Sequence, residues 1–390
     1  MGTKQTIIFE APVQSASGYG EHAREVANFL IPMFDSNFHI VETHWGHTQS
    51  TCNSKTDYIK YISKKIEGDS PIDIYIQMAL PSEFKAIGNI NVGITALIEC
   101  SVCSEDFVRG CNKMNIVVFP SNFAKKVLED SAKKYGINLS CDIRVIPQTT
   151  NITTDKSELD LNYITEDFCF LFNGKWNIDS NVSAERKNIE TLIRCFVSAF
   201  HSHSTKPALI LKTHNKNYSK LDYTRTETKI KSIINEVHTE LSVPSVYLLH
   251  GELSDSEMKS LYTDDKVKCY VSCSRGEGFG RPVLEASMYG LPVIASKWSG
   301  HCDIVLDELN YIIGDLVETP HINNGMGEGA MWYKCTNTSI QNKLLDVYEN
   351  YDQYKVCAKN TQSKNKKEFC SDLILNKYKD IFNSYIQSNI

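Results

Sequence analysis

Short runs of β-branched and aromatic residues alternate with amphipathic stretches along almost the whole chain. Parallel strands need a crossover connection, usually a helix, so this alternation predicts parallel sheets with helices on both faces. The expected strands of the first half are QTIIFE, HIVETHW, IDIYIQM, NVGITALI, NIVVFPS and DIRVIPQ. The expected helices among them are EHAREVANFLIPMF and SNFAKKVLEDSAKKYG, the second with Ser121 as N-cap and Gly136 as C-cap.

The pattern is interrupted once, over the polar and non-periodic residues 149–165, and then restarts. The strands expected after this linker are FCFLFNGKW, ALILKTH, SVYLLHGEL, VKCYVSCS and LPVIASK, with a helix over ERKNIETLIRCFVSAF. The 390 residues accommodate two domains. We therefore expect an α/β protein with doubly wound domains over 1–160 and 161–365, followed by a C-terminal helix over 366–390. Leu373, Tyr378 and Ile381 mark the apolar face of that helix.

Composition excludes several classes of protein. With 42% hydrophobic and 10% aromatic residues the chain can bury cores, which argues against disorder. A net charge of −6 gives no general basic field for nucleic acid or an anionic membrane. No apolar run is long enough to span a membrane, and the first residues enter a strand-like run without a signal region. We expect a cytoplasmic protein.

The cysteines favour free thiols over a metal site. There are thirteen, an odd number, scattered along the chain. Cys100 and Cys103 form a single CxxC, and no second pair follows at the spacing of a zinc site.

The segment SRGEGFGRPVLEASMYG carries the clearest chemistry. It follows an expected strand, and Pro282 suits the first turn of the helix that follows. Gly278 and Gly280 let a ligand approach the backbone at the start of that helix, an arrangement that binds phosphate groups. Glu285 lies about one turn further on, where a carboxylate can accept two adjacent ribose hydroxyls. Glu277 precedes the glycines, so we expect it to bind sugar hydroxyls or to stabilise positive charge.

Glu277, seven residues and Glu285 within EGFGRPVLEASMYGLPVIAS resemble the E-x7-E signature of retaining glycosyltransferases with the GT-B fold. The resemblance is closest to the large family four, the glycosyl transferases of group 1. It implies two Rossmann-like domains facing a cleft, with the C-terminal helix crossing back to the first domain. Gly278, Phe279, Gly280 and Glu285 would then bind the nucleotide-sugar donor, and Glu277 would act in catalysis.

Other segments extend the resemblance along the chain. FNGKWN and ERKNIETLI resemble the stretches whose basic residues reach the donor diphosphate, which places Lys175 and Lys187 there. The spacer NIDSNVSAE is longer than usual, so the second basic residue is either Arg186 or Lys187.

The first half resembles the family in two further places. Gly18 and Gly20 lie in SASGYGEHAREVANFL, which resembles the loop that closes over donor phosphates and acceptor; a plain turn is the alternative. The segment around Glu99 resembles a variant from viral and phage genomes, in which a glutamate lies near the cleft. Glu99 either acts on the acceptor or caps a turn.

The resemblance implies transfer of a sugar from a nucleotide sugar, a UDP-sugar above all, to an acceptor hydroxyl with retention. It implies no cofactor and no metal, since a helix N-terminus and lysines can neutralise the diphosphate. One alternative is a phosphorylase or epimerase on the same domains, and another is a non-catalytic sugar-nucleotide or glycan-binding protein.

The acceptor is the least constrained substrate. A viral chain could glycosylate hydroxymethylated pyrimidines in DNA, but such an enzyme must bind phosphates. Residues 1–160 hold fifteen Lys and Arg against nineteen Asp and Glu. Their compact basic feature is Lys125, Lys126, Lys133 and Lys134 on one expected helix. A glycan or glycoconjugate acceptor is therefore favoured over DNA.

Overall fold

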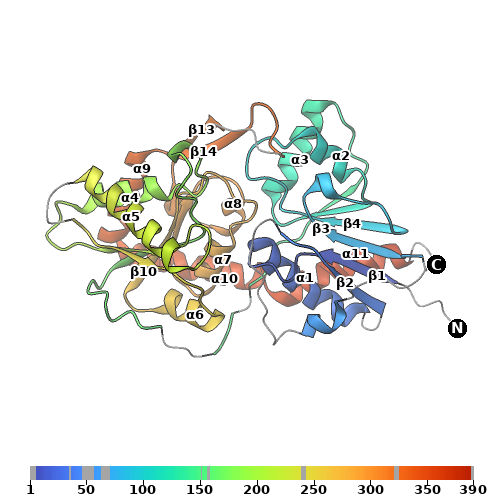
Figure 1. Cartoon of the computed structure of the whole chain (residues 1–390), viewed down its shortest axis with the longest axis horizontal. Coiled ribbons are helices and arrows are strands. Elements are labelled where there is room, and N and C mark those ends of the chain that lie inside the picture. Colours follow the sequence, from blue (N-terminus) through green and yellow to red (C-terminus); the bar gives the residue numbers. More distant parts are fainter. Residues whose placement is uncertain are drawn as a thin grey trace. The chain divides into compact units, whose positions relative to one another are not determined.

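The computed structural model describes residues 6–34, 37–45, 57–62, 71–150, 152–155, 159–238, 243–319 and 325–387 (Figure 1). The chain divides into two units, which are described in turn. The first consists of Met1–Thr149, Ile322–Ala330 and Phe369–Ile390, and the second of Thr150–His321 and Met331–Glu368. The division after Thr149 precedes the expected boundary at residue 160, and the inclusion of Ile322–Ala330 in the first unit was not expected.

The first unit contains a six-stranded sheet with the order β2-β1-β3-β4-β5-β6. All neighbouring strands are parallel, and the six predicted strands are present. Their bounds are β1 (Ile7–Ala11), β2 (Phe38–Glu42), β3 (Ile74–Met78), β4 (Ile90–Ile94), β5 (Ile116–Phe119) and β6 (Asp142–Val145). The strand order reverses at β1, so the ends of β1 and β3 flank the switch point where such sheets bind ligands.

Helices cover both faces of this sheet, as the alternation predicts. They are α1 (Gly18–Phe34), α2 (Glu105–Cys111) and α3 (Asn122–Tyr135), with short 3₁₀ turns η2 (Asp57–Tyr61) and η3 (Pro81–Glu83). α1 packs in one core cluster and α2 with α3 in another. The predicted caps of α3 are confirmed: the Ser121 hydroxyl accepts the Ala124 N–H at 3.1 Å, and Gly136 has a φ of 66°.

The C-terminal helix α11 (Ser371–Gln387) belongs to the first unit, as the resemblance implies. Figure 1 shows it beside α1, and the Phe29 and Tyr378 rings lie 6.1 Å apart. The prediction that Leu373 lies on the apolar face was wrong: Leu373 is 38% exposed, whereas its neighbour Ile374 is 1% exposed. The expected start at residue 366 was also too early, because residues 366–368 end the preceding helix.

A short segment from the second half of the chain completes the first unit. The Ser104 N–H donates to the Gly325 carbonyl at 2.7 Å, and the Gly327 N–H donates to the Val102 carbonyl at 2.9 Å. An isolated antiparallel bridge joins Cys103 to Met326 between them. Periodicity could not predict this contact, since the segment forms no regular element of its own.

The second unit contains another six-stranded parallel sheet, with the order β12-β11-β10-β7-β8-β9. Its strands are β7 (Cys169–Asn173), β8 (Ala208–Lys212), β9 (Val246–Leu249), β10 (Val267–Ser272), β11 (Val293–Ser296) and β12 (Tyr311–Ile312). The five predicted strands are present; the two-residue β12 was missed. Also missed was the antiparallel pair β13 (Gly314–Glu318) and β14 (Met331–Cys335). The order reverses between β7 and β10, as in dinucleotide-binding sheets.

Helices again accompany this sheet. They are α4 (Ile189–Phe200), α5 (Lys220–Val237), α6 (Asp255–Thr263), α7 (Arg281–Met288), α8 (His301–Ile304), α9 (Asn337–Glu349) and α10 (Tyr351–Glu368), with 3₁₀ turns η4 (Val182–Ala184) and η5 (Glu308–Asn310). Among the described residues, no helix combines the length and apolarity needed to cross a membrane.

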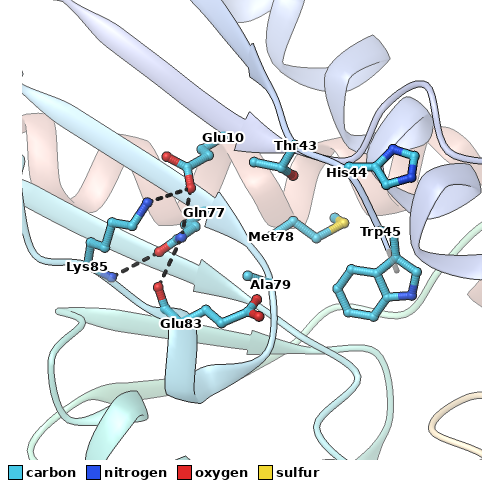
Figure 2. Close-up of a pocket in the computed structure, with 9 residues that line it drawn as sticks. All are labelled: Glu10, Thr43, His44, Trp45, Gln77, Met78, Ala79, Glu83 and Lys85. Atoms are coloured by element: carbon cyan, nitrogen blue, oxygen red, sulfur yellow. Dashed lines mark hydrogen bonds and ion pairs between the residues drawn. The ribbon is translucent and has the colours of Figure 1, made fainter. Parts of the chain in front are cut away.

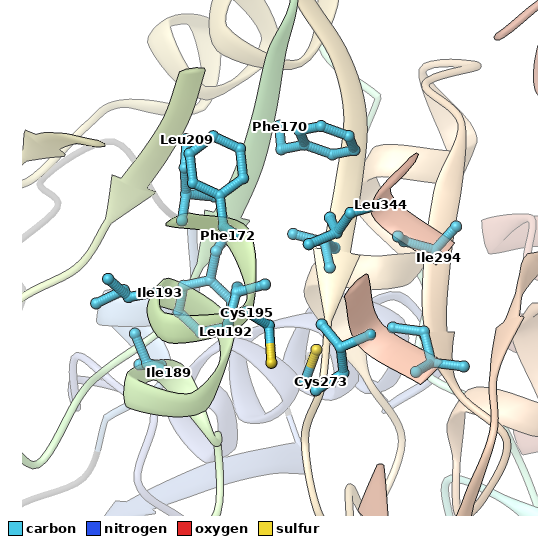
Figure 3. Close-up of a cluster of buried hydrophobic side chains, with 14 of the residues drawn as sticks. Phe170, Phe172, Ile189, Leu192, Ile193, Cys195, Leu209, Cys273, Ile294 and Leu344 are labelled. Carbon is cyan, nitrogen blue, oxygen red and sulfur yellow. The ribbon is translucent and has the colours of Figure 1, made fainter. Parts of the chain in front are cut away.

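The core of the second unit fixes the strand ends that carry the candidate site. Figure 3 shows Phe172 on β7 and Leu192 on α4 in one cluster with Cys273, which directly follows β10. All three side chains are at most 1% exposed. The ends of β7 and β10 and the start of α4 are therefore held by a single packed core.

We predict that Ile374→Ala destabilises the protein by about 2–5 kcal/mol, because it leaves a cavity where α11 meets the first sheet. Leu373→Ala, the matched control one position earlier, should change the free energy of unfolding by at most about 0.5 kcal/mol. Urea unfolding of both variants measures the difference. Equal effects would show that α11 does not pack through this face.

Candidate functional site

The candidate site lies at the carboxyl ends of β7 and β10, where the strand order reverses. β10 ends at Ser272 and α7 begins at Arg281, so the predicted strand, turn and helix are present. Gly280 is the N-cap of α7 with a φ of 102°, a conformation that glycine adopts at little cost. Pro282 stands in the first turn of α7, and Gly290 follows the helix with a φ of 82°.

The Glu277 carboxylate is buried in the turn between two cations. Its Oε1 accepts a hydrogen bond from Lys187 Nζ at 2.6 Å and another from the Ser274 hydroxyl at 2.7 Å. Its Oε2 lies 3.0 Å from Nη1 of Arg186. Burial raises the pKa of Glu277, but the charges of Arg186 and Lys187 lower it by more, so this pKa lies well below its usual range. The carboxylate is therefore ionised at neutral pH.

Both basic residues that the sequence left as alternatives reach this carboxylate. Arg186 also donates to the Gly276 carbonyl at 2.6 Å, so it binds the turn as well as Glu277. Lys187 lies next to the loop after β7: an added Cβ at Gly174 would be 3.8 Å from Lys187 Cε. The long spacer thus brings two cations, rather than one, to the motif.

A second arginine, Arg275, fastens the spacer to the turn. Arg275 is only 4% exposed, and its Nε donates to the Glu185 carbonyl at 3.2 Å. Its Nη2 donates to the Val182 carbonyl and to Asn188 Oδ1, both at 3.2 Å. These bonds hold the chain on both sides of Arg186 and Lys187, at Val182 and Glu185 before the pair and at Asn188 after it.

The start of α4 is held from within the spacer. The buried Glu185 carboxylate accepts the Lys187 N–H at 2.8 Å and the Ile189 N–H at 2.9 Å, so it satisfies donors at the helix N-terminus. Asn188 adopts the left-handed region with a φ of 60°, which turns the chain into the helix. Neither the role of Glu185 nor that of Asn188 was predicted from the sequence. The glutamate just before the Arg-Lys pair was the available signal.

Glu285 lies on α7 in a hydrogen-bonded chain that crosses to β7. Its Oε1 accepts from Arg281 Nε at 2.9 Å, and its Oε2 accepts from the Tyr262 hydroxyl at 3.1 Å. Asn173 Nδ2 donates to the same hydroxyl at 3.2 Å. The Glu285 side chain is 21% exposed, so these bonds orient a carboxylate that solvent still reaches.

The glycines of the turn have packing reasons for their identity. An added Cβ at Gly280 would lie 2.8 Å from His301 Cδ2, and one at Gly300 would lie 2.5 Å from Phe279 Cα. The Phe279 residue is 3% exposed, so its ring belongs to the protein interior. Gly278 is also buried in this turn. Close backbone packing is thus one requirement for this sequence, whatever ligand it binds.

His301 stands behind the turn as a neutral ring. Burial lowers its pKa to about 4, although the Glu277 charge acts in the opposite direction. Its Nδ1 lies 3.1 Å from the Ser296 hydroxyl. The Ser299 hydroxyl accepts the Glu277 N–H at 3.0 Å. Residues 299–301, after β11, therefore pack against the turn and hold it through these contacts.

Positive charge extends along the ends of β7 and β8. Lys175 is exposed on the loop after β7. Lys212 is 7% exposed at the end of β8, and its Nζ donates to the Gly251 carbonyl at 2.5 Å. Burial lowers the pKa of His214 to about 4, and the charges of Lys212 and Lys175 contribute to that shift. Lys212 was not predicted as a site residue, because in the sequence it looks like an ordinary lysine at the end of a strand.

The remaining candidates belong to the first unit. Gly18 and Gly20 lie in the first turn of α1, not in a loop before the helix as expected. A Cβ at Gly20 would lie 1.9 Å from the Ser15 carbonyl oxygen, so glycine is needed there for the helix to pack on the preceding segment. Gly18 has open space around its Cα. Glu99 is half-buried, and its charge contributes to the raised pKa of Tyr19, which burial raises most.

The CxxC cysteines are buried thiols. Burial raises the pKa of Cys100 to about 12 and that of Cys103 to about 11. Over the part of the chain that the structure describes, no three His, Cys, Asp or Glu side chains are grouped so that they could hold a metal ion.

Known proteins resemble the chain in sequence over one region and in structure throughout. Residues 239–364, which include both motif glutamates, match the family model of "Glycosyl transferases group 1". Sucrose-phosphate synthase from Thermosynechococcus elongatus is similar, with a TM-score of 0.65, 14% identity and 98% of this chain and 100% of that chain covered. HepE from Anabaena in complex with UDP gives a TM-score of 0.64, 13% identity and coverages of 97% and 100%. Trehalose 6-phosphate synthase from Burkholderia multivorans gives a TM-score of 0.63 and 7% identity, with 99% of this chain and 98% of that chain covered.

No protein with a curated description matches the sequence significantly. The structural similarities extend over nearly the whole chain and both sheets. The fold is GT-B, as the sequence predicts.

We predict that Arg275→Met lowers stability by about 2–5 kcal/mol, because two buried acceptors and one partly buried acceptor lose their donor. Arg225→Met is the matched control: Arg225 pairs with Asp179 on the surface, where a salt bridge contributes about 0–1 kcal/mol. Urea unfolding measures both variants. If Arg275→Met unfolds like Arg225→Met, the spacer does not depend on the buried guanidinium.

Proposed function

We propose that the protein transfers a sugar from a nucleotide sugar to an acceptor hydroxyl, with retention of the anomeric configuration. The observation that carries the proposal is the buried Glu277 carboxylate between Arg186 and Lys187 at the switch point of the second sheet. This arrangement combines a fixed negative charge with cations that can bind a diphosphate, beside the start of a helix. The family match over residues 239–364 supports the same activity.

The donor diphosphate is bound by the cations at the ends of β7 and β10. Lys187, Arg186 and Lys175 supply positive charge, and the turn at Gly278 and Gly280 brings the start of α7 close. As the bond to the sugar breaks, negative charge grows on the diphosphate, and preorganised cations stabilise it. No divalent cation is required by this chemistry.

Glu285 and Glu277 have different tasks in this proposal. Glu285 is oriented by Arg281 and Tyr262 and keeps acceptor capacity for the ribose hydroxyls, since a carboxylate can accept about four hydrogen bonds. Glu277 remains ionised, so it can bind sugar hydroxyls and stabilise the positive charge of an oxocarbenium-like transition state. The second task requires a depressed pKa, which its two cations provide.

UDP is the nucleotide that we propose for the donor. HepE has been crystallised in complex with UDP, with UDP and glucose, and with UDP-glucose. These ligands are properties of HepE and suggest where to begin with this chain. Retention follows the resemblance to the E-x7-E enzymes, and Glu99 remains the candidate for a role on the acceptor side.

A glycan or glycoconjugate acceptor fits the first unit better than DNA does. The basic feature of α3 is partly compensated by its own helix: Lys125 faces Glu129, and Lys126 and Lys133 face Asp130, whereas Lys134 donates to the Glu328 carbonyl. Such pairs make a solvated surface rather than a groove that binds successive phosphates. Transfer to hydroxymethylated bases in viral DNA is the second candidate.

The direct test is a thermal-shift screen of nucleotide sugars, followed by assays of transfer and of slow donor hydrolysis. UDP-sugars should raise the melting temperature and release UDP. Binding without either reaction would favour a non-catalytic protein. Phosphate-dependent cleavage or sugar isomerisation would favour a phosphorylase or an epimerase.

We predict that Glu285→Ala weakens donor binding by about 10- to 100-fold, because charge-assisted hydrogen bonds to the ribose are lost. Glu277→Gln should instead lose turnover while the donor still binds. Calorimetric titration of the donor and initial rates separate the two effects. Glu308→Gln, which changes a 73% exposed carboxylate, is the control. Native affinity and rate in both variants would place the site elsewhere.

We also predict that activity survives EDTA and collapses in Lys187→Ala, because protein cations neutralise the leaving diphosphate. Lys216→Ala, at a 65% exposed lysine of the same unit, should retain activity. Rates are measured in EDTA-treated enzyme with and without added Mn²⁺. A strict requirement for Mn²⁺ would contradict this assignment.

A further inference from the structure

The first unit has a pocket at its own switch point, formed by residues outside the motif. The pocket has a volume of about 390 Å³, within the range of roughly 300–1,000 Å³ that small-molecule sites occupy. Its lining comes from the carboxyl ends of β1, β2 and β3 and from the turn after β3 (Figure 2). Ligands of doubly wound sheets bind at this edge.

One wall of the pocket is a fixed polar network around Glu10. Glu10 on β1 pairs in register with Gln77 on β3, so both side chains lie on the same face of the sheet. The Glu10 carboxylate accepts hydrogen bonds from the Tyr75 hydroxyl at 2.8 Å, from Gln77 Nε2 at 3.0 Å and from Lys85 Nζ at 3.0 Å. The dashed lines of Figure 2 show the bonds of Gln77 and Lys85. These hydrogen bonds fix the side chains of this wall before any ligand binds.

The opposite wall is a flat aromatic surface. Figure 2 shows Trp45 across the pocket from Glu10 and Lys85. The Trp45 ring stacks on Tyr19, with centroids 3.8 Å apart and an angle of 15° between the planes. The Tyr19 hydroxyl lies 3.1 Å from Thr95 Oγ1 and accepts the Ala96 N–H at 3.0 Å. Tyr19 thus holds Trp45 in place. The flat indole suits the C–H face of a sugar ring.

The charge of the pocket selects against anions. Glu10 and Glu83 are two carboxylates and Lys85 is one ammonium group, so acidic side chains outnumber the lysine in the lining. The structure shows no partner for the Glu83 carboxylate among the residues that it describes, and Figure 2 shows this group pointing toward Trp45. A phosphate offers only acceptors and would face both carboxylates. Hydroxyls both donate and accept, so they match Glu83, Glu10 and Lys85 together.

We propose that this pocket binds the acceptor and that the acceptor is an uncharged saccharide. The inference rests on the proposed function. In the transfer, the acceptor hydroxyl oxygen forms a bond to the anomeric carbon of the donor sugar. The bond from that carbon to the diphosphate oxygen breaks, and its electron pair leaves with the nucleoside diphosphate. The hydroxyl proton passes to the released diphosphate.

The test uses the full chain with UDP-sugars and two acceptor panels. One contains uncharged mono- and disaccharides, and the other contains the corresponding sugar 6-phosphates. Duplex DNA carrying hydroxymethylcytosine serves as a third acceptor. Wild-type enzyme should use a member of the uncharged panel, with a KM at least about tenfold below that of its phosphate.

Variants assign the acceptor to this pocket. Trp45→Ala and Glu83→Gln should each raise the acceptor KM about tenfold or more, since one loses the stacking surface and the other a charge-assisted hydrogen bond. Glu83→Lys should reverse the charge of the wall and lower the KM for the sugar phosphate. Glu105→Gln is the control, because this carboxylate of the same unit pairs with Arg109 on α2. Circular dichroism of every variant checks that it folds.

The outcomes separate this proposal from the proposed function. If wild-type enzyme neither binds nor hydrolyses any nucleotide sugar, the proposed function itself fails. If it transfers sugar but prefers the phosphates or the DNA, the acceptor class is wrong. If it uses uncharged saccharides while the folded Trp45→Ala and Glu83→Gln variants keep the acceptor KM of Glu105→Gln, the pocket is wrong.

Discussion

The second unit depends on a buried carboxylate that two cations keep ionised. An unpaired carboxylate at the depth of Glu277 would cost several kcal/mol or would take up a proton. Arg186 and Lys187 prevent this, but they can do so only if the spacer before them has one conformation. Arg275 provides that conformation, since its guanidinium binds the second half of the spacer at Val182 and Glu185 and also binds Asn188, just after the two cations. The ionised state of Glu277 therefore depends on the two cations. The positions of the cations depend on the spacer, and the conformation of the spacer depends on Arg275.

Most of the fold could be predicted because its elements are local and periodic. The strands of both sheets and helix α3 with its caps follow from residue patterns over fewer than twenty residues. The elements that were missed have no such pattern. β12 has two residues, and the segment at Gly325–Gly327 pairs with Val102 and Ser104 without forming a helix or strand. Leu373 was assigned to the buried face of α11 because periodicity alone cannot tell which of two adjacent apolar residues packs inward.

The candidate site could be predicted in part. Spacing identified the turn and its two glutamates, because a strand, a glycine turn and a helix are consecutive in sequence. It could not identify Arg275 or Tyr262, since their partners lie 87–93 and 23 residues away. Gly20, expected to serve a ligand, also has a packing requirement that its sequence context does not show, because a Cβ there would meet the backbone of Ser15. Such contacts between distant segments depend on tertiary packing, which a local pattern does not contain.

The two switch points follow one topological rule but have opposite electrostatics. Arg186, Lys187 and Lys175 outnumber Glu277 at the end of β7 and β10, so that edge attracts an anion. Glu10 and Glu83 outnumber Lys85 at the end of β1 and β3, so that edge repels one. A nucleotide sugar carries its charge on the diphosphate, so in the proposed transfer the first pocket would discriminate against it by charge rather than by a steric barrier. An uncharged saccharide has no net charge to pair with the cations of the second unit, whereas its hydroxyls can satisfy the mixed donors and acceptors of the first. Charge alone would thus sort the two substrates, provided that the acceptor carries no phosphate.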